Sequence, residues 1–286
     1  IECPYLFQFA LDCNTNNLKL IFWSGAGNYY VGSFDVKAFT AQNWPFTIRE
    51  GNNFAASQTF NNIPAEDGRR ILIANGTGEY PNMPFDCAMT FPVELTLVTS
   101  GGNPLICCNP VREIVLLRTS TNNWSSQALT SGVNVMSGIT GEAFELDSYF
   151  QPGTATSLTF TLRGTTVTYN CSAQTVSCAG STQTLAPVNG VVHLRMLVDR
   201  GTVEIFGNDG LVYMSMSVMP TAGSQAVSLV ASGSGATLNS MSMYNLGSAW
   251  STDTASTNAP PSISANPVPQ IGQLGALAKF TVTAGG

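Results

Sequence analysis

Short apolar runs separated by turn-forming residues dominate the sequence. Within these runs, β-branched and aromatic residues alternate with polar ones, and Gly, Asn and Asp stand between them, which is typical of β-strands. Amphipathic stretches with helical spacing are scarce. The pattern therefore predicts an all-β chain. The clearest predicted strands lie in 18–25 (LKLIFWSG), 29–35 (YYVGSFD), 69–76 (RRILIANG), 93–99 (VELTLVT), 157–164 (SLTFTLRG), 191–199 (VVHLRMLVD), 202–210 (TVEIFGNDG) and 211–219 (LVYMSMSVM).

Local sequence features make three further predictions about these strands. The tetrapeptide GNDG at 207–210 joins two alternating runs, so we predict a hairpin there. The segment VREIVLLR at 111–118 fits either a strand or a short connector. Cys107 and Cys108 are adjacent, so in a strand their side chains should point to opposite faces, and we expect at most one of them in the core.

The composition changes along the chain in a way that suggests separate domains. Residues 1 to about 110 carry most of the aromatic residues and prolines. From 125 to 247 the chain reads as alternating strands at regular spacing, which is typical of a β-sandwich. The segment 248–262 has the composition of a Ser/Thr/Pro linker. The residues after it are too few to bury a core of their own, so we expect that a further domain is cut off there.

Composition and charge favour an extracellular protein without a nucleic-acid or membrane partner. Apolar residues make up 44% of the 286 residues and charged residues only 10%, against roughly 25% charged residues in an average soluble domain. The net charge is −6 and the sequence has no basic run, so we do not expect nucleic-acid binding. No stretch approaches the ~20 apolar residues of a membrane span.

The cysteines and the single histidine limit the chemistry that we expect. The seven cysteines form no CxxC pair and His193 is the only histidine, so we expect no metal site and no cofactor. Cys171 and Cys178 flank a turn-like hexapeptide. We predict a disulfide between them, as would fit an oxidising compartment, with two unpaired thiols as the alternative. His193 lies in an alternating run and is interpreted as an ordinary strand histidine.

Carboxylates are the remaining candidates for chemistry. No Ser-His-Asp arrangement, phosphate loop or dinucleotide fingerprint is present in the sequence. Carboxylate chemistry on an all-β scaffold favours glycoside hydrolysis. Spacing alone does not select a pair among the carboxylates of the first segment, which are Glu2, Asp12, Asp35, Glu50, Glu66, Asp67, Glu79, Asp86 and Glu94. In the later DRGTVE segment, a second carboxylate site is the alternative, and we interpret Asp199, Arg200 and Glu204 as a surface salt bridge plus a strand-turn contact.

A resemblance to a known family selects one of these carboxylates. The segment ECPYLF at 2–7 resembles the Glu-Cys-Pro motif of glycoside hydrolase family 32, the invertases, inulinases and levanases. Further segments resemble that family in its own order, over about residues 1–250. They are 27–40 (GNYYVGSFDVKAFT), 51–73 (GNNFAASQTFNNIPAEDGRRILI), 79–97 (EYPNMPFDCAMTFPVELTL), 109–114 (NPVREI), 194–210 (LRMLVDRGTVEIFGNDG) and 243–250 (MYNLGSAW).

The resemblance implies a domain organisation for the chain. Residues 1–110 would be the later blades of a five-bladed catalytic β-propeller and 125–250 a C-terminal β-sandwich. A connector at 111–124 would join them. A linker at 251–262 and the start of an immunoglobulin-like domain at 263–286 would follow. The family's aspartate motifs NDPNG and RDP precede the Glu-Cys-Pro motif and are absent from the sequence, so we expect a chain truncated at both ends.

The resemblance also implies an activity. Glu2 would be the general acid/base of a secreted or cell-surface hydrolase that releases terminal fructose from levan, inulin or sucrose with retention. The resemblance implies sugar contacts by Asn53, Gln58, Tyr80 and Asp86, with a structural hydrogen-bonding role as the alternative for each. Ala55 stands where the family usually has Tyr, which implies altered specificity or reduced activity. The alternative is a carbohydrate-binding or adhesive surface protein with a degenerate propeller and further immunoglobulin-like domains in the same chain.

Overall fold

The computed structural model describes residues 2–48, 50–78, Tyr80, Met83, residues 87–249 and the short strands Ser262–Ala265 and Thr283–Gly285. These residues form an all-β structure, as predicted, and the one helical segment among them is a short 3₁₀ helix. No helix in this described part is long and apolar enough to span a membrane. The chain divides into the units Ile1–Gly247 and Ser248–Gly286, which are considered separately.

The first unit begins with two antiparallel sheets. The first sheet has the order β1-β2-β3-β4, with β5 also paired to β3, and the second has the order β6-β7-β8-β9. Alternate positions of these strands are buried, among them Ile21, Trp23, Leu72 and Leu95, which join one apolar cluster. The strands are β1 (Tyr5–Ala10), β2 (Leu18–Trp23), β3 (Asn28–Phe34), β4 (Phe39–Ala41), β5 (Phe46–Thr47), β6 (Ala55–Thr59), β7 (Arg70–Asn75), β8 (Val93–Ser100) and β9 (Asn103–Pro110).

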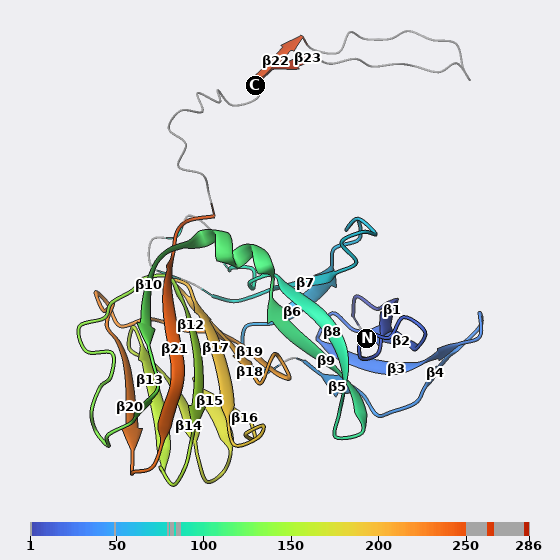
Figure 1. Ribbon diagram of the computed structural model, residues 1–286. Coiled ribbons are helices and arrows are strands. Elements are labelled where there is room, and N and C mark those ends of the chain that lie inside the picture. Colours follow the sequence, from blue (N-terminus) through green and yellow to red (C-terminus); the bar gives the residue numbers. More distant parts are fainter. Residues whose placement is uncertain are drawn as a thin grey trace, which may run out of the picture. The chain divides into compact units, whose positions relative to one another are not determined.

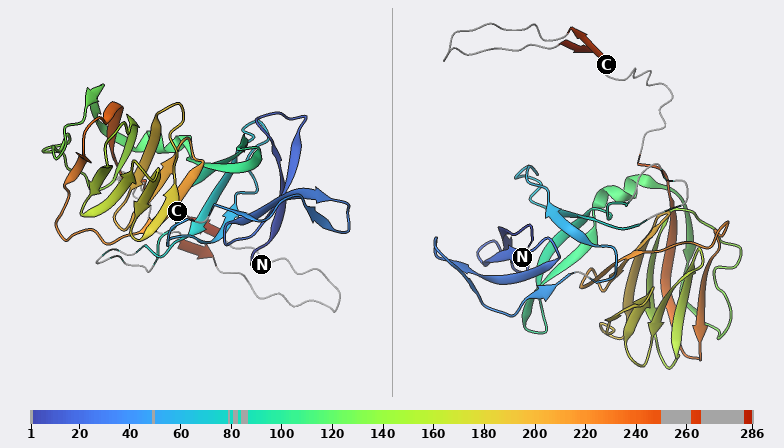
Figure 2. Two further views of the ribbon diagram at one scale, coloured as in Figure 1. Left: turned by 90° about the horizontal axis from the view of Figure 1, so that it is seen from below. Right: turned by 180° about the vertical axis from the view of Figure 1, so that it is seen from behind.

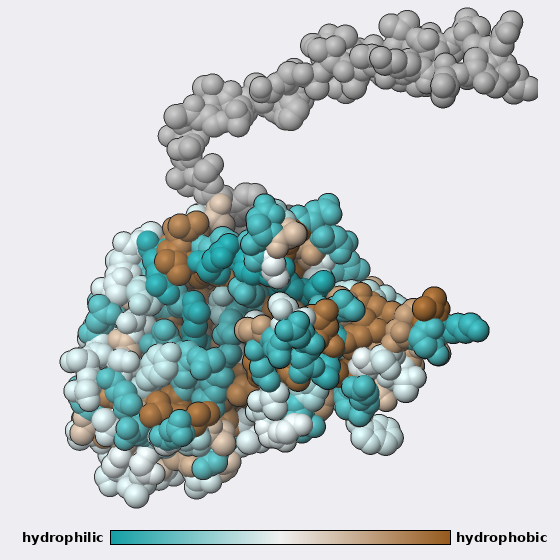
Figure 3. All heavy atoms as spheres, turned by 45° about the vertical axis from the view of Figure 1, so that its right-hand side comes forward, coloured by the Kyte–Doolittle hydropathy of each residue, from teal (hydrophilic) through white to brown (hydrophobic). Residues whose placement is uncertain are grey.

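The sheet β1–β5 leaves part of its apolar surface uncovered. Figure 3 shows hydrophobic residues gathered on the projecting part of the molecule, and Leu6, Leu18 and Phe34 of this sheet are exposed large apolar side chains. Trp44, in the loop between β4 and β5, is 90% exposed. Apolar surface of this kind on a soluble protein commonly marks a site of contact with another molecule.

The segment for which the sequence left two interpretations forms a connector. Residues Arg112–Leu117 form the 3₁₀ helix η1, in which Ile114 alone is buried. The next strand, β10 (Arg118–Trp124), lies within the range predicted as connector and pairs with β21 (Thr237–Leu246) of the sheet that follows.

Two antiparallel sheets then pack face to face around a second apolar cluster (Figures 1 and 2). The seven-stranded sheet has the order β10-β21-β12-β17-β18-β19, with β11 paired to β21, and the five-stranded sheet has the order β16-β15-β14-β13-β20. Their remaining strands are β11 (Gln127–Ala128), β12 (Phe144–Gln151), β13 (Ser157–Leu162), β14 (Thr165–Asn170), β15 (Thr175–Cys178), β16 (Ser181–Thr184), β17 (Val192–Val198), β18 (Thr202–Gly207), β19 (Val212–Ser217) and β20 (Val227–Ser232).

The predicted hairpin at GNDG is confirmed. It joins β18 to β19, and Asn208, Asp209 and Gly210 all have positive φ. Gly210 is required there, since a Cβ added to it would meet the carbonyl oxygen of Cys108 at 2.2 Å. The turn therefore brings the seven-stranded sheet into backbone contact with β9, and the Cys108 N–H donates to the Gly210 carbonyl at 2.9 Å.

The seven-stranded sheet is buried on both faces where it meets the sheet β6–β9. Every residue of β18 is buried. One face lies in the core between the two packed sheets, while Leu197, Phe206 and Tyr213 join the apolar cluster of the first two sheets. We call this contact between β8–β9 and β17–β19 the junction; β8 and β9 lie between the β1–β5 sheet and the seven-stranded sheet in Figure 1.

The junction also explains why one prediction about cysteines is wrong. Cys107 and Cys108 point to opposite faces of β9, yet both are buried, with 4% and 0% exposure. Cys107 faces a cleft beside the seven-stranded sheet and Cys108 lies near Glu204 within the junction. A strand that is covered on both sides buries both of two neighbouring residues, and the sequence did not reveal the second cover.

The predicted disulfide between Cys171 and Cys178 is also wrong, because both are free thiols. In the β14–β15 hairpin, Cys178 is paired with Val167, while Cys171 follows the last residue of β14. Cys171 thus lies beyond Asn170, and the three strand steps from Val167 to Asn170 alone span about 10 Å at roughly 3.3 Å per residue. A disulfide requires Cα atoms within about 7 Å.

The second unit has a short described region. β22 (Ser262–Ala265) and β23 (Thr283–Gly285) form an antiparallel pair with one register shift. The predicted linker at 251–262 lies outside the described residues except for Ser262, and most of the predicted immunoglobulin-like start at 263–286 lies outside them too.

Candidate functional site

Glu2 lies just before β1, with its side chain exposed. Its backbone is fixed although its carboxyl group is free, because the Gly25 N–H donates to the Glu2 carbonyl at 2.9 Å. Cys3, the next residue, adopts a left-handed conformation with φ of 45°. A carboxylate that is held through its backbone and open to solvent can exchange a proton with a bound molecule.

The three described residues among the four predicted to contact sugar do not gather in one place. Gln58 is exposed on β6, where it follows Ser57, whose N–H donates to the Gly25 carbonyl at 2.8 Å. Gln58 is therefore the chain neighbour of a residue that is hydrogen-bonded to Gly25, which in turn is hydrogen-bonded to Glu2. Asp86 lies outside the described residues.

Asn53 and Tyr80 are engaged elsewhere. Asn53 is fully buried, and its Oδ1 accepts the N–H groups of Thr77 at 2.6 Å and Gly78 at 3.0 Å, while its Nδ2 donates to Ser215 Oγ at 3.0 Å. Its amide thus ties two loops to β19 and has no surface left for a sugar. The Tyr80 ring lies 5.6 Å from the Arg163 guanidinium, at the side of the two packed sheets.

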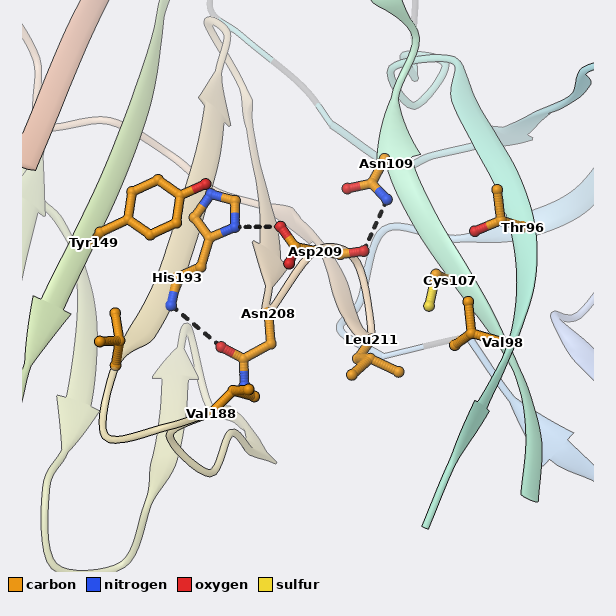
Figure 4. Close-up of a pocket in the computed structure, with 11 residues that line it drawn as sticks. Thr96, Val98, Cys107, Asn109, Tyr149, Val188, His193, Asn208, Asp209 and Leu211 are labelled. Carbon is orange, nitrogen blue, oxygen red and sulfur yellow. Dashed lines mark hydrogen bonds and ion pairs between the residues drawn. The ribbon is translucent and has the colours of Figure 1, made fainter. Parts of the chain in front are cut away.

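A cleft of about 560 Å³ opens beside the junction, between β8–β9 and the seven-stranded sheet (Figure 4). His193 lies in it, on β17 as predicted, but its environment is not ordinary. Its Nε2 is 2.7 Å from Asp147 Oδ1 and its Nδ1 is 2.8 Å from Asp209 Oδ1. Its ring stacks on Tyr149 at 4.1 Å between centroids and 7° between planes.

Two carboxylates that flank both ring nitrogens favour the doubly protonated imidazolium, because each nitrogen can then donate. Burial alone would lower the pKa of His193, but the hydrogen bonds and charges of Asp147 and Asp209 together raise it above its ordinary value. The sequence signal that could have revealed this was weak, since Asp147 lies 46 residues away from His193.

Glu204 is a second titratable group at the junction, and its predicted place at the surface is wrong. Its side chain is fully buried. One carboxyl oxygen accepts the Phe91 N–H at 2.7 Å and the other lies 2.8 Å from the Tyr213 hydroxyl. Burial raises the pKa of Glu204 to about 8, against the lowering effect of these two hydrogen bonds. At neutral pH this carboxyl group is therefore mostly protonated, and it serves structure rather than surface pairing.

No three His, Cys, Asp or Glu side chains in the described part of the chain are placed to hold a metal ion. The candidate chemical groups among the described residues are thus the exposed carboxylate of Glu2, His193 between two aspartates in the cleft, and the buried carboxyl group of Glu204.

Comparison with known proteins identifies the family. Residues 113–245 match the family described as glycosyl hydrolases family 32 C terminal. The levanase of Bacillus subtilis is 28% identical over 293 residues, which cover 88% of this chain and 43% of that protein. The extracellular exo-inulinase of Aspergillus awamori is 24% identical over 301 residues, which cover 87% of this chain and 55% of that protein. Most of the chain is thus homologous to proteins of glycoside hydrolase family 32.

Solved structures show the same fold. The crystal structure of exo-inulinase from Aspergillus awamori superposes with a TM-score of 0.73 at 22% identity, over 87% of this chain and 57% of that one. The β-fructofuranosidase of Schwanniomyces occidentalis gives 0.72 at 17% identity, over 86% and 60%. The chain thus spans about half the length of the family 32 proteins that it matches.

Proposed function

We propose that this family 32 chain forms part of a secreted or cell-surface hydrolase that releases terminal fructose from levan, inulin or sucrose with retention. Glu2 carries this proposal, because the Glu-Cys-Pro motif places it next to a fixed backbone with its carboxyl group in solvent. The similarity to a levanase and an exo-inulinase supports the substrate class.

Glu2 would act first as acid and then as base. It protonates the oxygen of the leaving group while a second carboxylate attacks the sugar, and it then activates the water that releases fructose. A retaining pair lies about 5–5.5 Å apart. We expect the nucleophile and the transition-state stabiliser in the family's NDPNG and RDP motifs, which this sequence does not contain. The 286-residue chain alone is therefore expected to be inactive.

The antiparallel meanders β1–β4 and β6–β9 support a propeller interpretation of residues 1–110. In each sheet four strands follow one another in order, as in the blades of a propeller, and β5 is additionally paired to β3 in the first. We propose that they are two blades of the catalytic domain, and that 125–250 is the C-terminal sandwich.

The test measures fructose release from levan, inulin and sucrose by the 286-residue chain and by the complete gene product in which it occurs. The complete gene product should be active. In it, Glu2→Gln should lower turnover by about 10²–10⁴-fold and leave sugar binding nearly intact, because the amide keeps the shape and removes the proton. Release by the purified 286-residue chain, or an unimpaired variant, would contradict this role of Glu2.

Carbohydrate binding without catalysis is the second candidate, and the cleft is the observation that favours it. Tyr149 is 38% exposed there, and an aromatic ring beside carboxylate and amide groups suits a sugar with one apolar face. Calorimetry with inulin and levan tests it on the 286-residue chain, with Tyr149→Ala as the variant that should lose binding. Absence of binding by the unaltered chain removes this candidate.

A further inference from the structure

We propose that Gly25 and Ser57 are positioning residues for Glu2, connecting its backbone to strand β6. The inference rests on the proposed function of Glu2. An acid/base must be held within about 0.5 Å and 10–20° of its working geometry, and an exposed side chain depends for this on what holds its backbone.

Gly25 forms the first connection, on its amide side. It lies in the turn between β2 and β3, is buried, and its N–H donates to the Glu2 carbonyl at 2.9 Å. The Ser24 hydroxyl lies 3.5 Å from the same carbonyl. The segment before β1 is thereby attached to a tight turn of the neighbouring hairpin rather than extending freely from it.

Ser57 forms the second connection, on the carbonyl side of Gly25. The Gly25 carbonyl accepts the Ser57 N–H at 2.8 Å and the Ser57 hydroxyl at 2.9 Å. The same hydroxyl accepts the Trp23 Nε1–H at 3.2 Å. Trp23 and Ser57 are both fully buried. Every polar group of this path is paired, so the path has one arrangement rather than several.

The strand β6 is shaped to make this contact. Its register with β7 shifts between Ala55 and Gln58, and Ala56 has a positive φ of 46°. Such a bulge redirects side chains, and bulges are common beside active sites. Here Ser57 is buried between two exposed neighbours, Ala56 and Gln58.

The surroundings of Gly25 leave no room for a side chain at this position. A Cβ added to Gly25 would meet the Cys3 Cβ at 2.9 Å, the Ala56 Cα at 3.4 Å and the Cys3 Sγ at 3.5 Å. Ala56 belongs to the backbone of a sheet, whereas Cys3 belongs to the segment before β1. Gly25→Ala should therefore displace Cys3 and Glu2 rather than β6.

The test uses Ser57→Ala, Gly25→Ala and a matched control. Ser148→Ala is the control, because Ser148 is also fully buried and its hydroxyl also donates to a backbone carbonyl, that of Leu194 at 2.8 Å, on the seven-stranded sheet. Amide hydrogen exchange of the 286-residue chain is the first readout. We expect the Gly25 amide to exchange about five- to tenfold faster in Ser57→Ala and at the unaltered rate in Ser148→Ala.

Kinetics of the complete gene product on inulin and levan are the second readout. Ser57→Ala and Gly25→Ala should lower kcat about ten- to a hundredfold with little change in KM, and Ser57→Thr, which keeps the hydroxyl, should restore part of it. Unaltered Gly25 exchange in Ser57→Ala, or an equal loss of kcat in Ser148→Ala, overturns the proposal. If the unaltered complete gene product releases no fructose, the proposed function fails, while the exchange result still decides whether Ser57 holds the Gly25–Glu2 contact.

Discussion

At the scale of single residues, two titratable groups at the junction make its stability depend on pH. Burial without a cation raises the pKa of Glu204. Burial also lowers the pKa of His193, but the two flanking aspartates outweigh it and raise that pKa overall. Both groups bind their protons more tightly in the folded chain than in the unfolded one. Linkage then requires that both contributions to stability are lost as pH rises.

Glu204→Gln isolates the first contribution. The folded pKa of Glu204 is about 8 against 4.5 in the unfolded chain, so its contribution is complete below about pH 4.5 and is lost as pH rises through 8. Glutamine can still accept the Phe91 N–H and donate to Tyr213, but it does not ionise. We expect the variant to match the unaltered chain at pH 4.5 and to exceed its free energy of unfolding at pH 9 by a few kcal/mol, measured by denaturant titration. A deficit at both pH values would contradict this.

His193→Asn isolates the second contribution. The pKa of His193 is raised above 6.5, so its ion pairs stabilise the fold fully below pH 6.5, and this stabilisation is lost as pH rises through the higher folded pKa. The variant should therefore be destabilised most at pH 6 and progressively less at higher pH. Urea titrations of both proteins measure the difference, and a difference that does not change with pH would show that the imidazole is neutral in the fold.

At the scale of elements, the β18–β19 turn makes the contacts that hold the two sides of the junction together. Asp209 pairs with His193 through its side chain and accepts the Asn109 Nδ2–H through its carbonyl at 2.8 Å, while Gly210 approaches Cys108. The sequence revealed the turn, because GNDG between alternating runs leaves few other conformations. It did not reveal what the turn touches, since the partners lie about a hundred residues away along the chain.

Comparing two glycines that have the same φ separates the stability cost of backbone strain from the cost of losing a contact. Gly180 and Gly210 both have φ of +86°, but a Cβ at Gly180 meets nothing within 4 Å. Gly180→Ala should cost only the left-handed backbone strain, about 1 kcal/mol. Gly210→Ala should cost clearly more, because it also separates the turn from β9. Thermal unfolding of the two variants measures this, and equal losses would mean that the turn does not hold the junction.

Contacts between residues far apart along the chain cannot be read from the sequence, and this explains the other differences between prediction and structure. The spacing of Cys171 and Cys178 suggested a bridge, but the hairpin register separates them, and register depends on pairing rather than on spacing. The prediction that Glu204 is exposed was wrong because both faces of the strand TVEIFG are covered, not one. Glu2 was found through its motif; the buried path through Ser57 that holds it required the fold.

At the scale of the whole molecule, the exposed apolar surface of the β1–β5 sheet should make the 286-residue chain associate. Leu18 is 52% exposed, Phe34 47% and Trp44 90%. Sedimentation velocity at rising concentration should show oligomers, and replacing Phe34 and Trp44 by Ser should shift the chain toward monomer. A single monomeric species at all concentrations would contradict this.

The central claim, that Glu2 is the acid/base of a retaining fructosidase, depends on its proton. The most direct measurement compares Glu2→Gln in the complete gene product on sucrose and on a fructosyl fluoride, whose leaving group needs no proton to depart. In the first turnover, before the second role of Glu2 as base is needed, the account predicts a fall of about 10²–10⁴-fold on sucrose and a far smaller fall in fluoride release. Equal losses on the two substrates, or none on sucrose, would contradict the assignment of Glu2.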